Sequence, residues 1–195
     1  EMASGAGAGS PITGSVTGTS KLVIADYGSS NIYVYNFNRG TGSATLLNRL
    51  SEATTVPSGF TGYVGGSSDF SPSGQYVYFT KGALAYYGPI YRWDYAAGVV
   101  ELVPGQSPTS RGSGYVQTAP NGRMYVNRGY PDYLPGFGEI ANPDSALISG
   151  VGYVQDKYTF PISSTSMDGL ATETIGVYVY DSGDAPASYE TAVLT

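Results

Sequence analysis

This chain of 195 residues contains no cysteine and no histidine. Without cysteine it has no disulfide, no thiolate nucleophile and no Cys-ligated zinc or iron–sulfur site. Without histidine it lacks the usual general base and the commonest transition-metal ligand. A Ser-His-Asp triad, a Cys-His pair and a His-zinc hydrolase are therefore excluded within this chain, and we expect a protein that is not an enzyme.

Charge and long apolar runs are also scarce. Charged residues make up 12% of the chain, about half of the usual share, and the net charge is −6. This balance argues against nucleic acid as a partner, because its phosphates require a basic surface. No run of about 18 apolar residues is present, and no apolar signal-peptide core follows Glu1. We therefore expect no transmembrane segment.

The chain is instead rich in tyrosine, with 19 residues, and in glycine, with 28. Tyrosine favours strands and tolerates half-buried surfaces, because one end of its ring is polar. The most informative pattern is a phrase that occurs twice, as SPSGQYVYF at 71–79 and as APNGRMYVN at 119–127. Its Pro-x-Gly element predicts a turn, and the aromatic run after it predicts a strand. Self-similarity at this spacing is typical of all-β repeat proteins.

Strands can be drawn around both copies of the phrase. A first hairpin is predicted at 22–27 and 32–37, and four strands follow at 63–70, 76–80, 90–95 and 99–103. Four antiparallel strands per repeat is the make-up of a β-propeller blade. The sequence thus predicts an all-β protein with antiparallel four-stranded blade-like sheets, either a partial or a small β-propeller. A β-sandwich is the alternative.

Some segments fit this scheme less well. Residues 129–150 contain Pro131, Pro135 and Pro143, which favours a long irregular loop over a central strand. A further strand is expected from residue 151. The apolar spacing at 46–50 and at 167–171 also fits short helices.

Three regions are expected along the chain. Residues 1–20 are rich in Ala, Gly and Ser and predict a flexible N-terminal arm, with strand addition to a neighbouring subunit as the sharper alternative. Residues 21–175 form the propeller-like domain. Residues 176–195 are expected to form a C-terminal strand and the start of a neighbouring module. The start at Glu1 suggests a chain processed or cut from a longer protein.

Two runs carry a resemblance to secreted bacterial proteins. Residues 70–79, followed by 90–94, resemble a blade of secreted β-propellers. Residues 117–126, followed by 140–144, resemble a segment of large surface proteins of Bacteroidetes-like bacteria. The resemblance implies a secreted protein at the bacterial cell surface, and it covers about residues 20 to 175.

The C-terminus resembles a second family. Residues 180–191 are similar to the opening of a GDAPxSY-type module that is repeated in very long adhesin-like surface proteins. The departures are Ser182 and Ala187, where the pattern more often has an aromatic and an acidic residue. This resemblance implies an extracellular surface protein that continues into a neighbouring module.

Two acidic turns are the candidate metal sites. Asp181 and Asp184 flank Gly183, and their carboxylates are hard oxygen ligands of the kind that calcium takes. An Asx-type turn without metal is the alternative, because the carboxylate spacing is not that of an EF-hand. Asp26 and Asn31, around Gly28, have the same two interpretations. Calcium is the one cofactor for which the sequence offers a site.

Aromatic and hydroxyl side chains supply the other candidates. Tyr86 and Tyr87 lie between glycines in a predicted loop, where they could stack on sugar rings. The aromatic residues at 91, 93 and 95 fall on one strand face, where core packing is the favoured interpretation. Ser145 lies in the triplet Asp-Ser-Ala, which fits the O-glycosylation pattern of Bacteroidetes-like bacteria. An unmodified loop is the alternative there.

The number of repeats bears on assembly. Propellers close with about four to eight blades, whereas this chain supplies about two full blades and two partial ones. Open sheet edges pair with other chains. We therefore expect a non-enzymatic structural or adhesive surface protein that self-associates through sheet edges as a homo-oligomer or filament and carries or contacts surface glycans. The alternative is a propeller that binds or hydrolyses carbohydrate with loop carboxylates and calcium.

Overall fold

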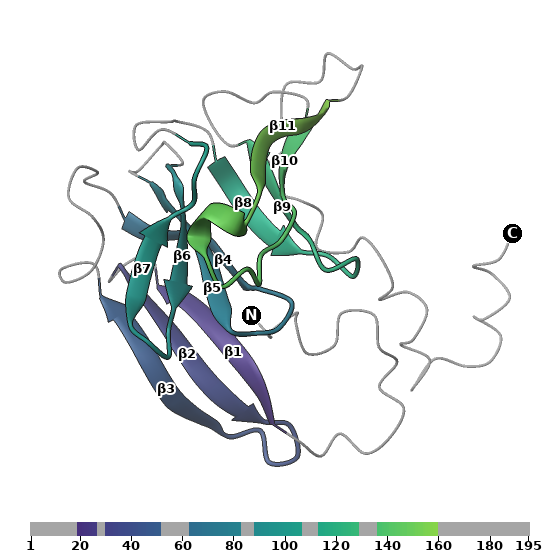
Figure 1. Ribbon diagram of the computed structural model, residues 1–195. Helices are drawn as coiled ribbons and strands as arrows, with labels where there is room; N and C mark the ends of the chain where they lie inside the picture. The colour runs from purple at the N-terminus through teal and green to yellow at the C-terminus, as the bar shows by residue number, and fades with distance from the viewer. Residues whose placement is uncertain are drawn as a thin grey trace, which may run out of the picture.

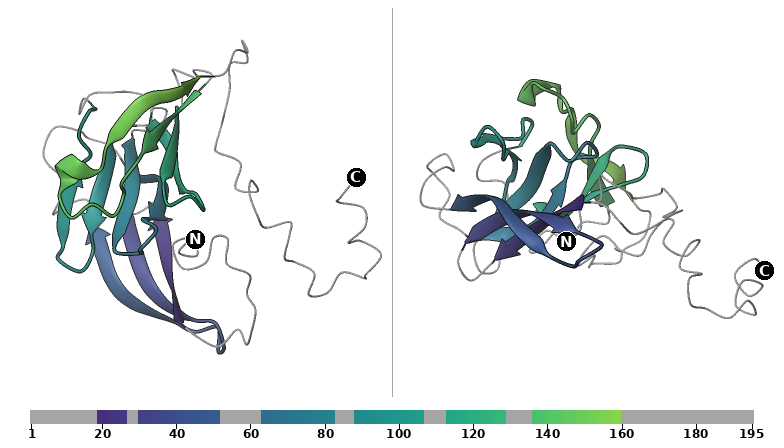
Figure 2. Two further views of the ribbon diagram at one scale, coloured as in Figure 1. Left: turned by 45° about the vertical axis from the view of Figure 1, so that its right-hand side comes forward. Right: turned by 90° about the horizontal axis from the view of Figure 1, so that it is seen from below.

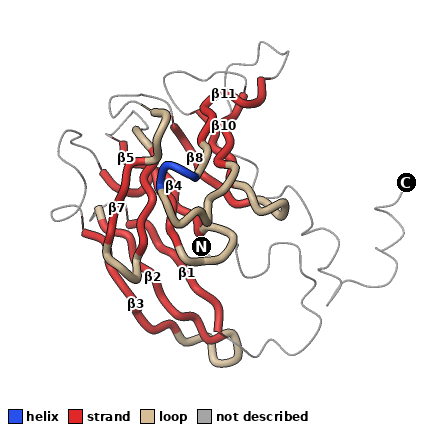
Figure 3. Tube along the Cα trace, viewed as in Figure 1, coloured by secondary structure: helices blue, strands red, loops and turns tan. Residues whose placement is uncertain are grey.

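The computed structural model describes residues 19–26, 30–51, 63–82, 88–106, 113–128 and 136–159. Within these ranges the chain forms eleven strands in three antiparallel sheets (Figure 1). The described helix is a short 3-10 turn, η2 (Ile148–Gly150), which is blue in Figure 3. The all-β class predicted from the sequence is confirmed.

Each sheet is an antiparallel meander, because strands that pair are also consecutive in sequence. The first sheet has the order β1-β2-β3, with β1 (Thr19–Asp26), β2 (Asn31–Asn38) and β3 (Ala44–Ser51). The second has the order β4-β5-β6-β7, with β4 (Tyr63–Phe70), β5 (Tyr76–Gly82), β6 (Ile90–Asp94) and β7 (Val99–Leu102). The third has the order β11-β10-β9-β8, with β8 (Ser113–Thr118), β9 (Met124–Arg128), β10 (Gly136–Ile140) and β11 (Tyr153–Thr159). Two of the three are the predicted four-stranded blade-like sheets.

The three sheets are stacked in sequence order, and the second lies between the other two (Figure 2). One core joins the first and second sheets: Val23, Ile32, Val34, Leu50, Phe70, Val77, Phe79, Tyr91, Trp93 and Tyr95. A second core joins the second and third sheets: Tyr76, Tyr78, Ile90, Val103, Val116, Met124, Val126, Ile140 and Val151. The first strands of the sheets, β1, β4 and β8, are neighbours across the stack. The stack has three layers, whereas the alternative β-sandwich would have two.

Residue patterns explain which sheet is covered on which side. In β2, Ile32 and Val34 are buried while Tyr33 and Tyr35 are half-buried, so alternate residues face the core and the surface. In β6, by contrast, four consecutive residues from Ile90 are buried. A strand covered on both faces loses the alternation, and this is the position of β6 in the middle sheet.

Both copies of the repeated phrase form the turn between the first two strands of a sheet. Gly74 and Gly122 adopt φ values of +70° and +77°, which other residues resist. The amide of Gly74 donates to the carbonyl of Ser71 at 2.7 Å, and that of Gly122 donates to Ala119 at 3.0 Å. The predicted Pro-x-Gly turns are therefore confirmed.

Two expectations about secondary structure are wrong. Residues 46–50, for which a short helix was one prediction, belong to β3, because they pair with β2 along one edge, with a bulge at Leu47. Residues 129–150, predicted as an irregular loop, contain β10, which lies centrally between β9 and β11. Pro131 and Pro135 precede this strand instead of interrupting it.

Candidate functional site

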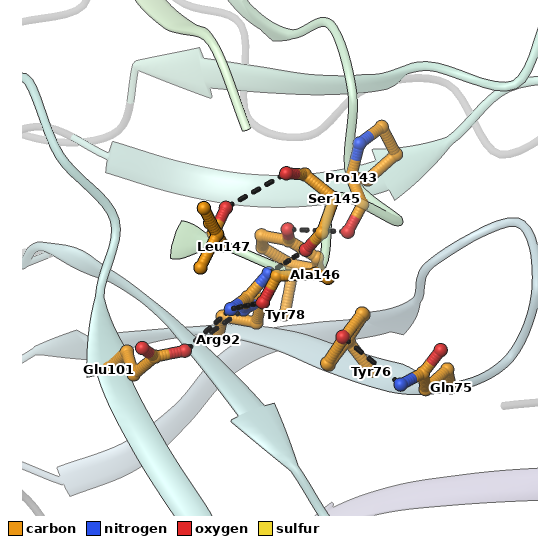
Figure 4. Close-up of polar contacts among 9 residues, drawn as sticks. All are labelled: Gln75, Tyr76, Tyr78, Arg92, Glu101, Pro143, Ser145, Ala146 and Leu147. Atoms are coloured by element: carbon orange, nitrogen blue, oxygen red, sulfur yellow. Dashed lines mark hydrogen bonds and ion pairs between the residues drawn. The ribbon is translucent and has the colours of Figure 1, made fainter. Parts of the chain in front are cut away.

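Arg92 is the centre of a buried polar cluster between the second and third sheets (Figure 4). Its side chain is 2% exposed and lies with its guanidinium carbon 4.3 Å from the centre of the Tyr76 ring. The guanidinium also pairs with Glu101, at 2.6 Å between Nη2 and Oε2. A buried cation costs free energy unless it is paired and hydrogen-bonded, and both conditions are met here.

The same cluster holds the segment 141–151, which connects β10 to β11. Arg92 donates from Nη1 to the carbonyl oxygen of Ser145 at 2.5 Å, and the Tyr78 hydroxyl donates to the carbonyl of Pro143 at 2.8 Å (Figure 4). Burial raises the pKa of Tyr78 well above its ordinary value, against the opposing influence of Arg92. Tyr78 therefore stays a neutral hydrogen-bond donor, and the cluster fastens one sheet to the next.

Ser145, the predicted glycosylation residue, lies in this fastened segment and is partly exposed. Its hydroxyl donates to the carbonyl of Leu147 at 2.9 Å. The hydroxyl also lies where a side chain on Gly150 would collide with it. A glycan on Ser145 would replace this internal hydrogen bond, and the modification stays a prediction.

The other sequence-based candidates have different outcomes. Tyr86, Tyr87, Asp181 and Asp184 lie outside the described residues, so the sugar-stacking and calcium predictions stay predictions. Asp26 and Asn31 are direct partners in the ladder of β1 and β2. Among the described residues, no group of three or more His, Cys, Asp or Glu side chains could hold a metal ion.

The aromatic residues of the 90–95 strand confirm the core interpretation. Tyr91, Trp93 and Tyr95 are 2%, 1% and 7% exposed and belong to the core between the first and second sheets. They are therefore packing residues and do not form a surface for sugar.

A second polar cluster, which sequence reasoning missed, lies on the outer face of the third sheet. Glu139 is 1% exposed and accepts hydrogen bonds from Arg123 at 2.6 Å, Lys157 at 2.9 Å and the Tyr158 hydroxyl at 2.7 Å. Burial alone would raise the pKa of Glu139, but these three donors outweigh it, and the pKa lies below its ordinary value. The hydrogen bond to Glu139 in turn raises the pKa of Tyr158.

Three aromatic rings lie on the same face of the sheet as this carboxylate. Phe137 lies between Tyr125 and Tyr158, with ring centroids 5.3 Å and 4.9 Å away. We call Tyr125, Phe137, Glu139 and Tyr158 the outer patch. Arg123 and Lys157 flank it, with side chains 43% and 38% exposed. The alternation of Phe137 and Glu139 in one strand is the sequence signal that could have located it.

The lowered pKa of Glu139 gives a pH-dependent prediction. An acid whose pKa is lower in the folded state stabilises the fold at pH values above its pKa in the unfolded chain, which is about 4.3. This stabilisation is lost as the pH falls through the pKa of the folded state. Glu139→Gln should therefore reduce the free energy of unfolding at pH 7, and the deficit should shrink as the pH falls below about 4. Urea denaturation of the natural chain and the variant at pH 7 and pH 3 measures this deficit.

A neutral substitution on the same sheet is the control. Val154→Ala, at a residue of β11 that is 49% exposed, should give a stability difference that does not change with pH. A deficit of Glu139→Gln that stays constant between pH 7 and pH 3 would show that the ionised carboxylate contributes nothing.

Comparisons with known proteins identify no family for this chain. No family model matches the chain, and no curated protein matches it. A solved structure of a protein from Lactobacillus plantarum is similar to this chain, with 18% sequence identity and a TM-score of 0.40. The similar region covers 63% of this chain and 33% of the other protein's chain. The chain thus spans about a third of that protein's length. None of the described helices is long and apolar enough to cross a membrane.

Proposed function

We propose that this chain is a non-enzymatic structural or adhesive protein of the bacterial cell surface, which self-associates through the edge of its first sheet. The observation that supports it is the unequal number of strands in the described part of the chain. The second and third sheets have four strands and the first has three. The outermost strand of the first sheet is β3, which leaves it in the position of an acceptor for one more strand.

The side chains of β3 fit this role. Residues 44–47 are all exposed, and Leu46 and Leu47 are 50% and 43% accessible to solvent. Natural edge strands are commonly protected by charge, proline or brevity. Over this half of β3 charge, proline and brevity are absent, since 44–47 reads Ala-Thr-Leu-Leu and the strand has eight residues. A bulge at Leu47 is the one irregularity of its pairing with β2. An added strand would pair with the outer edge of β3, beside both leucines, and complete a four-stranded sheet.

Self-association at β3 can be tested with charge. The double variant Leu46→Lys with Leu47→Lys places two like charges along the edge, and lysine at a sheet edge disfavours pairing with another strand. We expect the natural chain to form oligomers with rising concentration in sedimentation velocity or light scattering, and the double variant to remain monomeric over the same range.

Leu147→Lys is the matched control for this experiment. Leu147 is 72% exposed and lies in the segment between β10 and β11, outside the described strands. This variant should associate like the natural chain. A natural chain that stays monomeric at high concentration, or a control that is as monomeric as the double variant, would remove the support for assembly through β3.

Carbohydrate binding is the second candidate, and the outer patch is the observation that favours it. Aromatic rings next to hydrogen-bonding side chains are a general way to hold a sugar ring. Of the rings in the patch, Tyr158 is the most accessible, at 37%. Binding of a glycan library to the natural chain, and its loss in Tyr158→Ala, would support this function, whereas an array without any bound glycan would contradict it.

A further inference from the structure

Equivalent positions in the second and third sheets follow from the repeated phrase. Phe70 and Thr118 each precede the phrase directly, and they end the first strand of their sheets. Phe70 pairs with Val77, whereas Thr118 pairs with Met124, so the third sheet is shifted by one residue relative to the phrase. Val77 and Met124 are both buried against the preceding sheet. They are therefore structural equivalents, although the phrase aligns Met124 with Tyr76.

This equivalence relates the two polar clusters. Tyr78 pairs with Arg92 across β5 and β6, and Tyr125 pairs with Glu139 across β9 and β10. Tyr78 and Tyr125 come one residue after the equivalent residues Val77 and Met124. Because successive side chains of a strand point to opposite faces, both pairs point away from the preceding sheet. The pair in the second sheet holds the 141–151 segment of the third sheet. The pair in the third sheet occupies the same place on the outer face.

The first strands show the same correspondence. The amide of Thr118 donates to Oδ2 of Asp69 at 2.6 Å, which ties β8 to β4 of the preceding sheet. Gln117 of β8 is the equivalent of Asp69 of β4. Asp69 directly precedes Phe70, and Gln117 directly precedes Thr118, the equivalent of Phe70. Gln117 pairs with Tyr125 and lies on the outer face next to the outer patch. The outer face thus has polar and aromatic side chains at the positions through which the second sheet receives the third.

The chain itself supplies an occupant. After β11 ends at Thr159, 36 residues remain, 160–195. Connections of 11 residues (52–62) and 10 residues (103–112) lead from one sheet to the next, and 15 residues (160–174) separate β11 from the sequence IGVYVY at 175–180. Fifteen residues can span up to about 50 Å, so this sequence can reach β8. Its alternation of valine and tyrosine is that of a strand with one aliphatic and one aromatic face.

We propose that the outer face of the third sheet is the docking site of the chain's own C-terminal segment, with residues 175–180 lying against β8 as β8 lies against β4. In this arrangement the tyrosines or the valines of the segment cover the outer patch, and Gln117 meets the docked strand. The proposal concerns a different surface from β3, so it holds whether or not the chain self-associates. A docked segment would cover the outer patch, so this proposal and carbohydrate binding at the patch exclude each other.

Disulfide trapping in the full chain tests this directly, because the natural sequence has no cysteine. Gln117→Cys is combined, one at a time, with a cysteine replacing Val177, Tyr178, Val179 or Tyr180, and each double variant is oxidised at low concentration. We expect an intramolecular disulfide at two alternate positions, either 177 and 179 or 178 and 180, since only one face of a strand meets β8. Non-reducing gels and peptide mass spectrometry identify the linkage.

A control cysteine on the opposite side of the stack accompanies the series. Thr45→Cys, on the exposed half of β3, should form no disulfide with the same four partners. Preferential linkage to residue 45, linkage between two chains, equal linkage at all four positions or no linkage at all would each overturn the proposal.

Hydrogen exchange gives a second measurement that needs no cysteine. Replacement of Ile175, Val177 and Val179 by serine should undock the segment and speed exchange of the β8 amides. Exchange in the first sheet should not change. Equal β8 exchange in the variant and in the natural chain would contradict docking.

Discussion

Trp93→Ala is expected to lower the free energy of unfolding by about 3–5 kcal/mol. The Trp93 side chain is 1% exposed and lies in the core between the first and second sheets. Its ring meets that of Tyr95 edge-on, with centroids 5.9 Å apart. The substitution removes this contact and leaves a cavity that the sheets on both sides can fill only in part. A loss of this size is a large part of the stability of about 5–15 kcal/mol that is usual for a domain.

The measurement is urea denaturation followed by circular dichroism, because Trp93 is the only tryptophan of the chain and its fluorescence is lost in the variant. Val99→Ala, at a residue of the neighbouring strand β7 that is 48% exposed, is the control and should change stability by about 0.5 kcal/mol or less. Trp93→Phe should fall between the two. If Trp93→Ala were no more costly than the control, the packing of the first sheet on the second would not be a source of stability.

The second sheet is the part of the fold that was predicted best. Its four strands were placed at 63–70, 76–80, 90–95 and 99–103, and the structure has them at nearly the same residues. Local signals suffice here, because a Pro-x-Gly turn and an Asp-Tyr-Ala-Ala-Gly turn separate strongly aromatic runs. Where turn chemistry and hydrophobic pattern agree, a strand can be located without its partners.

β3 and β10 could not be located in this way. The residues of β3 are mostly exposed, so their apolar spacing carries no information on a buried face. β10 is short and has Gly136 and Gly138 among its five residues, which reads locally as a loop. β10 is held by a strand on each side, and β3 is held by β2 along one edge. Such pairing is long-range and leaves little trace in the strand's own composition.

The polar clusters were out of reach for a related reason. Glu139 receives its donors from 16, 18 and 19 residues away, and Arg92 reaches a carbonyl 53 residues along the chain. No spacing rule within one strand predicts either set of partners. Aligning the two copies of the phrase also puts the second strand of the third sheet one residue out of register with that of the second sheet. A shift of one residue moves every side chain to the other face. The equivalence of Arg92 and Glu139 is therefore visible only in the register.

Gly138→Ala is expected to cost about 2–3 kcal/mol, because the added methyl group has no room. A Cβ at this position would lie 2.5 Å from the carbonyl oxygen of Gln155 and 2.9 Å from that of Val154. Both atoms belong to the backbone of β11, so no side-chain rotation relieves the contact. The pairing is irregular at this point, with residues 155–157 opposite Gly138 alone, and this bulge brings Lys157 and Tyr158 to Glu139.

The substitution should therefore change the outer patch as well as the stability. Forcing β11 away from Gly138 lengthens the hydrogen bonds of Glu139, so the lowered pKa of this carboxylate should move back toward its ordinary value. Urea denaturation at pH 7, with NMR titration of the carboxylates, measures both effects. Gly40→Ala is the matched control, because its Cβ would come no closer than 3.4 Å to Asn38 and should change stability by about 0.5 kcal/mol or less. A Gly138 variant as stable as this control would mean that β11 can move off β10 without cost, and the bulge would then not be what positions Lys157 and Tyr158.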